Sequence, residues 1–180
     1  WKVGNNFVKA RVDKINHRLA TAARVGSSGE TRVISAEFLL VHTLAHILIR
    51  QLTSDCGYDS SSLRERIYVG EENIQNMTGL LIYTASGDVE GTLGGLVRQG
   101  LPGRIEATVK AALYNARLCS SDPLCLESDG QGVGGLNLSG CHACSLIPET
   151  SCEEGNRLLD RGVLLGGLGY ESSGFFKIED

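Results

Sequence analysis

The pattern of apolar and polar positions in the first third of the chain predicts two helices joined by a linker. In residues 5–24, apolar positions recur at helical spacing between basic ones, which is typical of an amphipathic helix. Residues 26–29, Gly-Ser-Ser-Gly, predict a flexible linker. Residues 35–56 are apolar on nearly every face, with Ser35 placed to cap the helix and Gly57 to end it. We therefore expect a buried central helix there.

Further along, the pattern predicts a small sheet and four more helices. Residues 67–69 look extended, and residues 79–85 are an apolar run of strand length that is rich in β-formers. The other predicted elements are a short helix from the serines at 60–62 through Arg66, a helix after the glycine-rich turn at 86–97, a helix from Pro102 to Leu118, and a helix begun by the capping box Ser151-Cys-Glu-Glu154 that carries Leu158, Leu159, Val163 and Leu164. The expected fold class is α+β and mostly helical, with helices around the central helix and a small sheet.

Length and composition limit the organisation of the chain. The 180 residues are 42% hydrophobic, enough to bury one core without covalent cross-links. The chain does not begin with Met, so we expect a piece of a longer protein. We expect a basic helix and linker over 1–30, a metal-binding domain over 31–165 and a tail over 166–180. No apolar run approaches the roughly 20 residues of a membrane span, and no signal peptide is visible, which predicts a reduced, cytoplasmic protein.

Cysteines carry the strongest chemical signal. Five of the six fall in one stretch, and the spacing Cys141-His142-Ala143-Cys144 lets two thiolates bind one metal through a tight turn. Cys119 and Cys125 form a second pair, with turn-forming residues between them. We predict a structural zinc ion bound by Cys119, Cys125, Cys141 and Cys144. Cys152 is the reserve ligand, able to replace Cys119 or Cys125, and disulfides or free thiols are the alternative to a metal site.

A histidine pair suggests a second candidate site. His42 and His46 are four residues apart on the central helix and therefore project from one face. If Asp88, Glu90 or Glu65 reached them, a mixed histidine and carboxylate metal site would form. An alternative function follows, in which His42, His46, Asp88 and Glu90 form a metal-dependent phosphodiesterase or nuclease. This alternative requires the four side chains to converge on a cleft open to solvent. The other interpretation is two hydrogen-bonded core histidines.

Charge is distributed unevenly along the chain. The net charge is −4, yet residues 1–24 carry six Lys and Arg against one Asp, which leaves −9 on the rest. The amino-terminal helix is therefore the candidate for DNA contact, through Lys9, Arg11 and Lys14. A solvated basic helix face is the alternative. The acidic remainder argues against indiscriminate DNA binding.

Four ordered blocks of the sequence resemble one known family. They are Val41–His46, Cys56–Tyr68, the turn Asp88–Gly95, and the cysteine region Cys119–Cys125 with Cys141–Cys144 and Pro148–Cys152. Together they look like the MrfA-like zinc-binding domain, above all the version at the carboxyl end of the DrmB family of the DISARM anti-phage defence system. The resemblance covers residues 35–165.

The resemblance implies a bacterial protein that works beside a DNA helicase subunit of the DrmA type, with the zinc domain as a folding and docking element. The chain has no Walker A motif, so we do not expect this segment to hydrolyse ATP. One departure concerns the ligands. The helicase-attached members have a more compact cysteine cluster, whereas residues 130–135 expand it here, and this leaves open which four thiolates bind.

Overall fold

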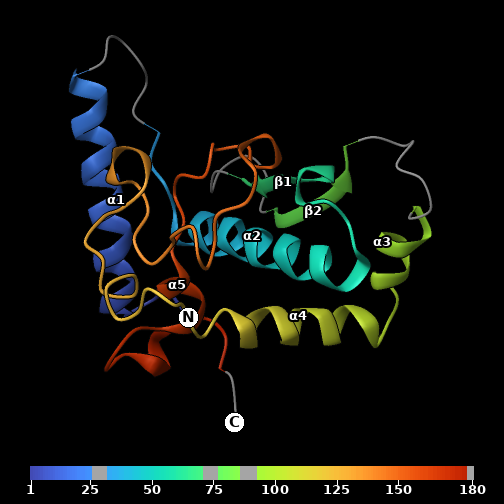
Figure 1. Cartoon of the computed structure of the whole chain (residues 1–180). Coiled ribbons are helices and arrows are strands. Elements are labelled where there is room, and N and C mark those ends of the chain that lie inside the picture. Colours follow the sequence, from blue (N-terminus) through green and yellow to red (C-terminus); the bar gives the residue numbers. More distant parts are fainter. Residues whose placement is uncertain (26–31, 71–76, 86–92, 178–180) are drawn as a thin grey trace.

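The computed structural model describes residues 1–25, 32–70, 77–85 and 93–177 (Figure 1). Its helices and strands are α1 (Asn6–Val25), α2 (Ala36–Cys56), β1 (Leu63–Val69), β2 (Thr78–Thr84), α3 (Leu93–Gln99), α4 (Arg104–Asn115) and α5 (Arg161–Leu165). Short 3-10 turns lie at Ser60–Ser62, Val133–Gly135, Glu149–Ser151 and Glu171–Ser173. The predicted linker at 26–29 falls outside the described residues. The expected α+β class, mostly helical with one small sheet, is confirmed.

Helix α2 is the buried centre of the molecule, as its sequence predicts. The Ser35 side chain accepts a hydrogen bond from the backbone N–H of Phe38 at its start, and Gly57 ends it with a φ of 69°. A left-handed residue at this position is easiest for glycine, which has no Cβ to clash with the following carbonyl. Thirteen residues of α2 are buried, so every face of this helix is covered by other elements.

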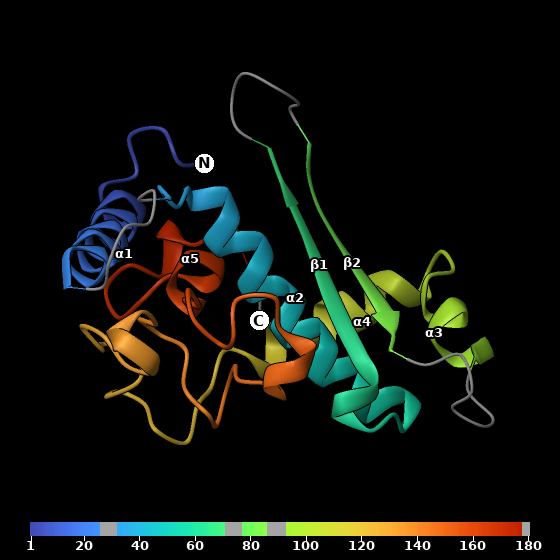
Figure 2. The ribbon, with the colours of Figure 1, turned by 90° about the horizontal axis from the view of Figure 1, so that it is seen from above.

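The other elements pack around α2. The β1–β2 hairpin covers one side and α4 lies along the opposite side, while α1 and α5 pack near its amino-terminal end (Figures 1 and 2). The largest group of buried apolar residues joins α1, α2, α4, α5 and the loop before α5; its members include Ile15, Leu39, Ile47, Leu113, Leu138 and Val163. A smaller group lies between the carboxyl end of α2, β1 and the loop around Ile147.

The two strands pair antiparallel, with Leu63 opposite Thr84 and Val69 opposite Thr78. The predicted strands are confirmed, but the predicted helix from Ser60 through Arg66 is wrong. Only Ser60–Ser62 is helical, as a 3-10 turn, and β1 begins at Leu63. From Leu63 to Arg66 the residues alternate between buried and exposed, a period of two that fits a strand with one covered face and cannot fit a helix.

The predicted helix that begins with a capping box at Ser151 is also wrong. Residues 152–160 are irregular, and α5 starts only at Arg161, where the Asp160 side chain accepts from the N–H of Gly162. Gly155, Asn156 and Leu158 all have positive φ values, between 58° and 63°. Such left-handed residues interrupt a right-handed helix. Helix α4 likewise ends at Asn115, short of the predicted Leu118.

Helix α1 packs against the rest of the molecule through apolar and charged side chains. Ile15 is fully buried in the main core, and the Asn16 side chain exchanges two hydrogen bonds with the backbone of Ile34. Arg11 makes a two-pronged ion pair with buried Asp160, at 2.6 and 2.7 Å. The residues after α5 also contact the domain, since the N–H of Phe175 donates to the carbonyl of Val163. The predicted division of the chain into segments at residues 30 and 165 stays a prediction.

Candidate metal centre

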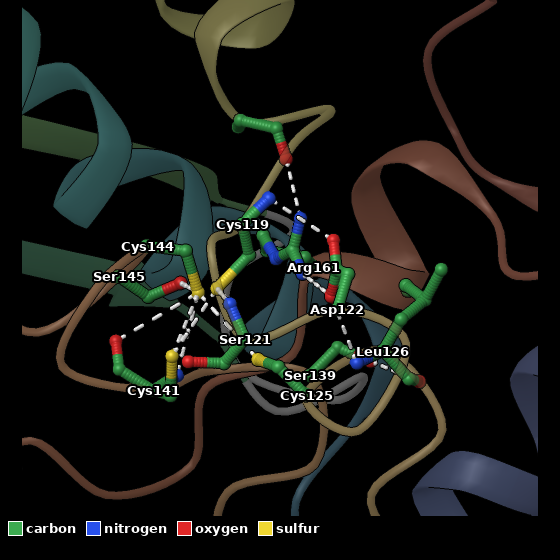
Figure 3. Close-up of polar contacts among 12 residues, drawn as sticks. Cys119, Ser121, Asp122, Cys125, Leu126, Ser139, Cys141, Cys144, Ser145 and Arg161 are labelled. Atoms are coloured by element: carbon green, nitrogen blue, oxygen red, sulfur yellow. Dashed lines mark hydrogen bonds and ion pairs between the residues drawn. The ribbon is translucent and has the colours of Figure 1, made fainter.

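Four thiols that are far apart in the sequence meet in the loops between α4 and α5. The sulfur atoms of Cys119, Cys125, Cys141 and Cys144, here called the thiol cluster, all lie within 4.8 Å of one another. Figure 3 shows these sulfurs pointing toward a common centre. The separations are 3.4 Å for Cys119–Cys141 and 3.7 Å for both Cys125–Cys144 and Cys141–Cys144.

These separations match a tetrahedral zinc site. With Zn–S bonds of about 2.3 Å, adjacent sulfurs of a tetrahedron are roughly 3.8 Å apart. A disulfide would bring two of them to about 2.05 Å, and all six cysteines are free thiols. The four thiols therefore have the donor type and the spacing that a closed structural zinc site requires.

Backbone N–H groups support the sulfurs. The N–H of Ser121 donates to the Cys119 sulfur at 3.4 Å, and the N–H of Cys141 donates to the Cys144 sulfur at 3.4 Å. The N–H groups of Cys144 and Ser145 both donate to the carbonyl of Cys141, which closes the tight turn between the two thiols. Hydrogen bonds to sulfur favour the thiolate form and orient it.

A partly buried ion pair fixes the thiol cluster to the helices. The Asp122 carboxylate accepts from the N–H groups of Cys119 and Leu126, at 3.0 and 3.1 Å, so it holds the loop between the first two thiols. Arg161, at the start of α5, donates to Asp122 at 2.8 Å and to the carbonyl of Ala116 at 2.8 Å (Figure 3). The end of α4, the loop between Cys119 and Cys125, and α5 are thereby joined.

Charge in this region favours a bound cation. Burial raises the pKa of the Cys125 thiol to about 12, so a thiolate there needs positive charge beside it. Arg161 supplies part of that charge. Its own burial opposes ionisation, but the neighbouring Cys144 and Asp122 raise the pKa of the guanidinium. Four thiolates around one Zn²⁺ would leave a net charge of −2, which a buried guanidinium partly offsets.

A comparison with protein families agrees with this geometry. The model of the MrfA Zn-binding domain matches residues 44–145, more than half of the chain. The chain belongs to the MrfA zinc-binding domain family. The resemblance seen in the sequence is confirmed, and the expected zinc cofactor fits both this family and the donor set. All four thiols of the thiol cluster lie inside the matched segment.

One relative connects this MrfA zinc-binding domain to a longer protein. The chain is 45% identical over 140 residues to the DISARM protein DrmB of Bacillus paralicheniformis. The match covers 78% of this chain and 24% of that protein, so the chain spans about a quarter of its relative. In the part of the chain that the structure describes, none of the helices combines the length and the apolar character needed to span a bilayer.

The reserve ligand Cys152 lies elsewhere in the domain. Its sulfur faces His42 and His46, at 3.3 and 3.2 Å, together with the carboxylate of Glu65. We call His42, His46, Glu65 and Cys152 the histidine cluster. Because Cys152 belongs to this separate group, the structure gives no support to its replacing Cys119 or Cys125.

The histidines do not meet the requirement of the phosphodiesterase alternative. His42 and His46 are 0% exposed, so no nucleic acid can reach them. Asp88 and Glu90 lie outside the described residues. Of the carboxylates considered from the sequence, Glu65 is the one that the structure places beside both histidines, at 3.0 and 3.5 Å. An open catalytic site built on this pair is therefore not favoured.

Sequence reasoning missed several residues of these sites. In the sequence, Glu65 stands out only as one of three acids that could reach the histidines, although its position between Leu63 and Ile67 in a strand places it on the covered face. A charged residue at such a position is a signal for a buried partner. Asp122 and Arg161 gave no local signal, because they are 39 residues apart and meet only in the folded chain.

Proposed function

We propose that this chain is a non-catalytic, zinc-stabilised interaction module of a bacterial, cytoplasmic anti-phage defence protein of the DrmB type, in which the thiol cluster binds one structural zinc ion. The closed set of four thiols carries this proposal. A complete thiolate shell leaves no coordination position for water or substrate, which is the property of a structural rather than a catalytic zinc site. The similarity to DISARM DrmB supports the role in defence.

The expected task of the zinc is to hold the irregular segment between α4 and α5. This segment contains two short 3-10 turns and one isolated bridge, between Gln131 and Asn137, and is otherwise without regular structure. Such a segment depends on side-chain links for its shape, because it has few ladder hydrogen bonds of its own. A zinc ion that joins its two thiol pairs would keep the surface around it in one conformation.

We further propose that a DNA helicase subunit of the DrmA type docks on the outer face of the β1–β2 hairpin. This face carries alternate residues of the two strands: Arg64, Arg66, Tyr68, Leu81 and Tyr83. Leu81 is 48% exposed and Tyr83 is 40% exposed. Arginine and tyrosine are enriched in protein interfaces, where they combine large contact area with hydrogen bonding.

Introducing negative charges on this face tests the docking proposal. In the full-length parent protein, we expect Leu81→Glu combined with Tyr83→Glu to reduce co-purification of the helicase subunit from the same defence system at least about tenfold, because two apolar contacts are replaced by charges. Tyr114→Glu is the matched control, since Tyr114 is exposed on α4, across α2 from the hairpin. Undiminished binding by the hairpin variant, with zinc retained, would refute this docking surface.

Fewer basic side chains of α1 are available to DNA than the sequence suggests. Arg11 is committed to buried Asp160, and Arg18 donates to the carbonyl of Gly135. Lys9 and Lys14 pair with Asp13 and Asp129 in exposed positions, where ion pairs are weak. We therefore propose that, among the basic side chains of α1 that the structure describes, these two lysines are the ones available to DNA phosphates.

A salt titration tests this contact. We expect weak binding to a short DNA duplex that declines steeply with salt and is lost when Lys9 and Lys14 are both replaced by Glu, because each removed cation reduces counterion release. Lys110→Glu, an exposed lysine on α4, should retain the binding. Binding that ignores salt, or that survives the double replacement, would exclude this helix as the DNA contact.

A further inference from the structure

The histidine cluster brings four donor atoms together in the interior, between α2, β1 and the loop that follows Ser151. The Nε2 atoms of His42 and His46 lie 3.0 and 3.5 Å from Oε1 of Glu65. They lie 3.3 and 3.2 Å from the sulfur of Cys152. One donor atom of each residue is within 4.8 Å of all the others. In a tetrahedral zinc site with N, O and S donors, adjacent donors are roughly 3.3–3.7 Å apart, so the observed spacing is close to that of a metal shell.

The outer hydrogen bonds of the two histidines determine which nitrogen faces inward without a proton. Nδ1 of His42 is 3.1 Å from the carbonyl of Leu158, and Nδ1 of His46 is 2.9 Å from the carbonyl of Ser145. A carbonyl oxygen can only accept, so Nδ1 must carry the proton in each ring. In a neutral imidazole Nε2 then has a lone pair, and both lone pairs point at Glu65 and Cys152. This is the orientation found in histidines that bind metals.

The centre of the histidine cluster is therefore a group of acceptors with too few protons. Oε2 of Glu65 has no hydrogen-bond partner among the described residues, although the Glu65 side chain is fully buried. Protonating both imidazoles would place two positive charges on rings whose centroids are 4.7 Å apart and sealed from water. One divalent cation would accept a lone pair from each of the four residues and offset the charges of the carboxylate and the thiolate. With one carboxylate and one thiolate, the charge of a Zn²⁺ site would be zero, which suits a buried position.

The backbone around Cys152 is shaped to support this arrangement. Leu158 has a φ of 63°, a left-handed conformation that is costly for a residue with a branched side chain. Its carbonyl is the acceptor for His42. Asn156, with a φ of 58°, donates its N–H to the Cys152 sulfur at 3.2 Å. The costly conformation of Leu158 and the left-handed conformation of Asn156, which asparagine adopts more readily, thus each orient a group toward the cluster.

We propose that the histidine cluster binds a second zinc ion, separate from that of the thiol cluster. The mixed nitrogen, oxygen and sulfur donor set suits zinc, and the four protein donors with full burial make the site structural. Its role is to fasten β1 and the loop around Cys152 onto α2. The site does not depend on the proposed docking or defence role.

Metal counting on the purified full-length parent protein, with this chain excised as a check, tests the proposal. Because a parent protein can carry zinc elsewhere, the measured quantity is the difference between wild type and variant. Glu65→Gln, which keeps the shape of the side chain and removes its charge, should lower the zinc content by about one ion per chain, and Cys152→Ala should do the same. Ser151→Ala is the matched control. Ser151 is buried in the same loop, but its hydroxyl donates to the carbonyl of Ser60 and is not a metal ligand. This control should keep its full zinc content.

Zinc-edge X-ray absorption on the wild-type chain keeps the test independent of whether a variant folds. Two loaded sites should give about 2.5 sulfur and about 1.5 nitrogen or oxygen neighbours per zinc, whereas the thiol cluster alone should give about four sulfurs. About one zinc with a pure sulfur shell would overturn the second site and leave the proposed function intact. About one zinc with a mixed shell would support the second site and overturn the thiol cluster as the zinc site.

Discussion

Replacing both Cys141 and Cys144 by serine is expected to remove the zinc of the thiol cluster and abolish cooperative unfolding of the domain. Structural zinc sites contribute about 10–16 kcal/mol of apparent binding free energy at neutral pH, which equals or exceeds the total stability of a typical domain, about 5–15 kcal/mol. The loops between α4 and α5 have little regular structure to replace that contribution. Thermal unfolding followed by circular dichroism, together with zinc analysis, measures the effect.

The sixth cysteine provides the control for this experiment. Cys56 ends α2, lies outside both clusters, and contacts the side chain of Gln99. Cys56→Ser should therefore keep full zinc content and a cooperative transition. A double variant at Cys141 and Cys144 that unfolds like the wild type would show that the thiol cluster does not stabilise the domain.

Replacing Asp160 by alanine is expected to destabilise the domain by about 3–5 kcal/mol, the range for removing one partner of a buried ion pair. Asp160 is 0% exposed, and its two carboxylate oxygens accept bidentate hydrogen bonds from the guanidinium of Arg11. Its carboxylate also accepts from the N–H groups of Ser139 and Gly162, so the variant loses the cap of α5 as well. Chemical denaturation of the purified domain gives the free energy of unfolding directly.

An exposed ion pair of the same helix is the comparison. Asp13 pairs with Lys9 one turn away, and both side chains are more than half exposed. Asp13→Ala should cost at most about 0.5 kcal/mol. Equal effects at the two aspartates would contradict the role given to the link between Arg11 and Asp160.

Local signals in the sequence predicted the parts of the fold that depend on local chemistry. The ends of α2 followed from Ser35 and Gly57, because a hydroxyl cap and a left-handed glycine act within a few residues. The four members of the thiol cluster followed from cysteine spacing and turn residues, and the structure brings those four together. Their assignment as the zinc ligands stays a prediction until the metal is located.

The errors arose where distant contacts outweigh local preference. The sequence from Ser151 to Glu154 has the form of a capping box, yet Cys152 faces two histidines of α2, more than 100 residues away in the sequence. Arg11 looks like one more cation of a basic helix until Asp160 is placed beside it. Neither partner is marked by periodicity or spacing, so both appear only in the folded chain.

Crystals of the domain measured on both sides of the zinc absorption edge would test the central claim most directly. We expect an anomalous difference peak enclosed by Cys119, Cys125, Cys141 and Cys144, about 2.3 Å from each sulfur. The absence of a zinc peak between these four sulfurs, in protein purified without chelators, would contradict the assignment of the thiol cluster as the structural zinc site.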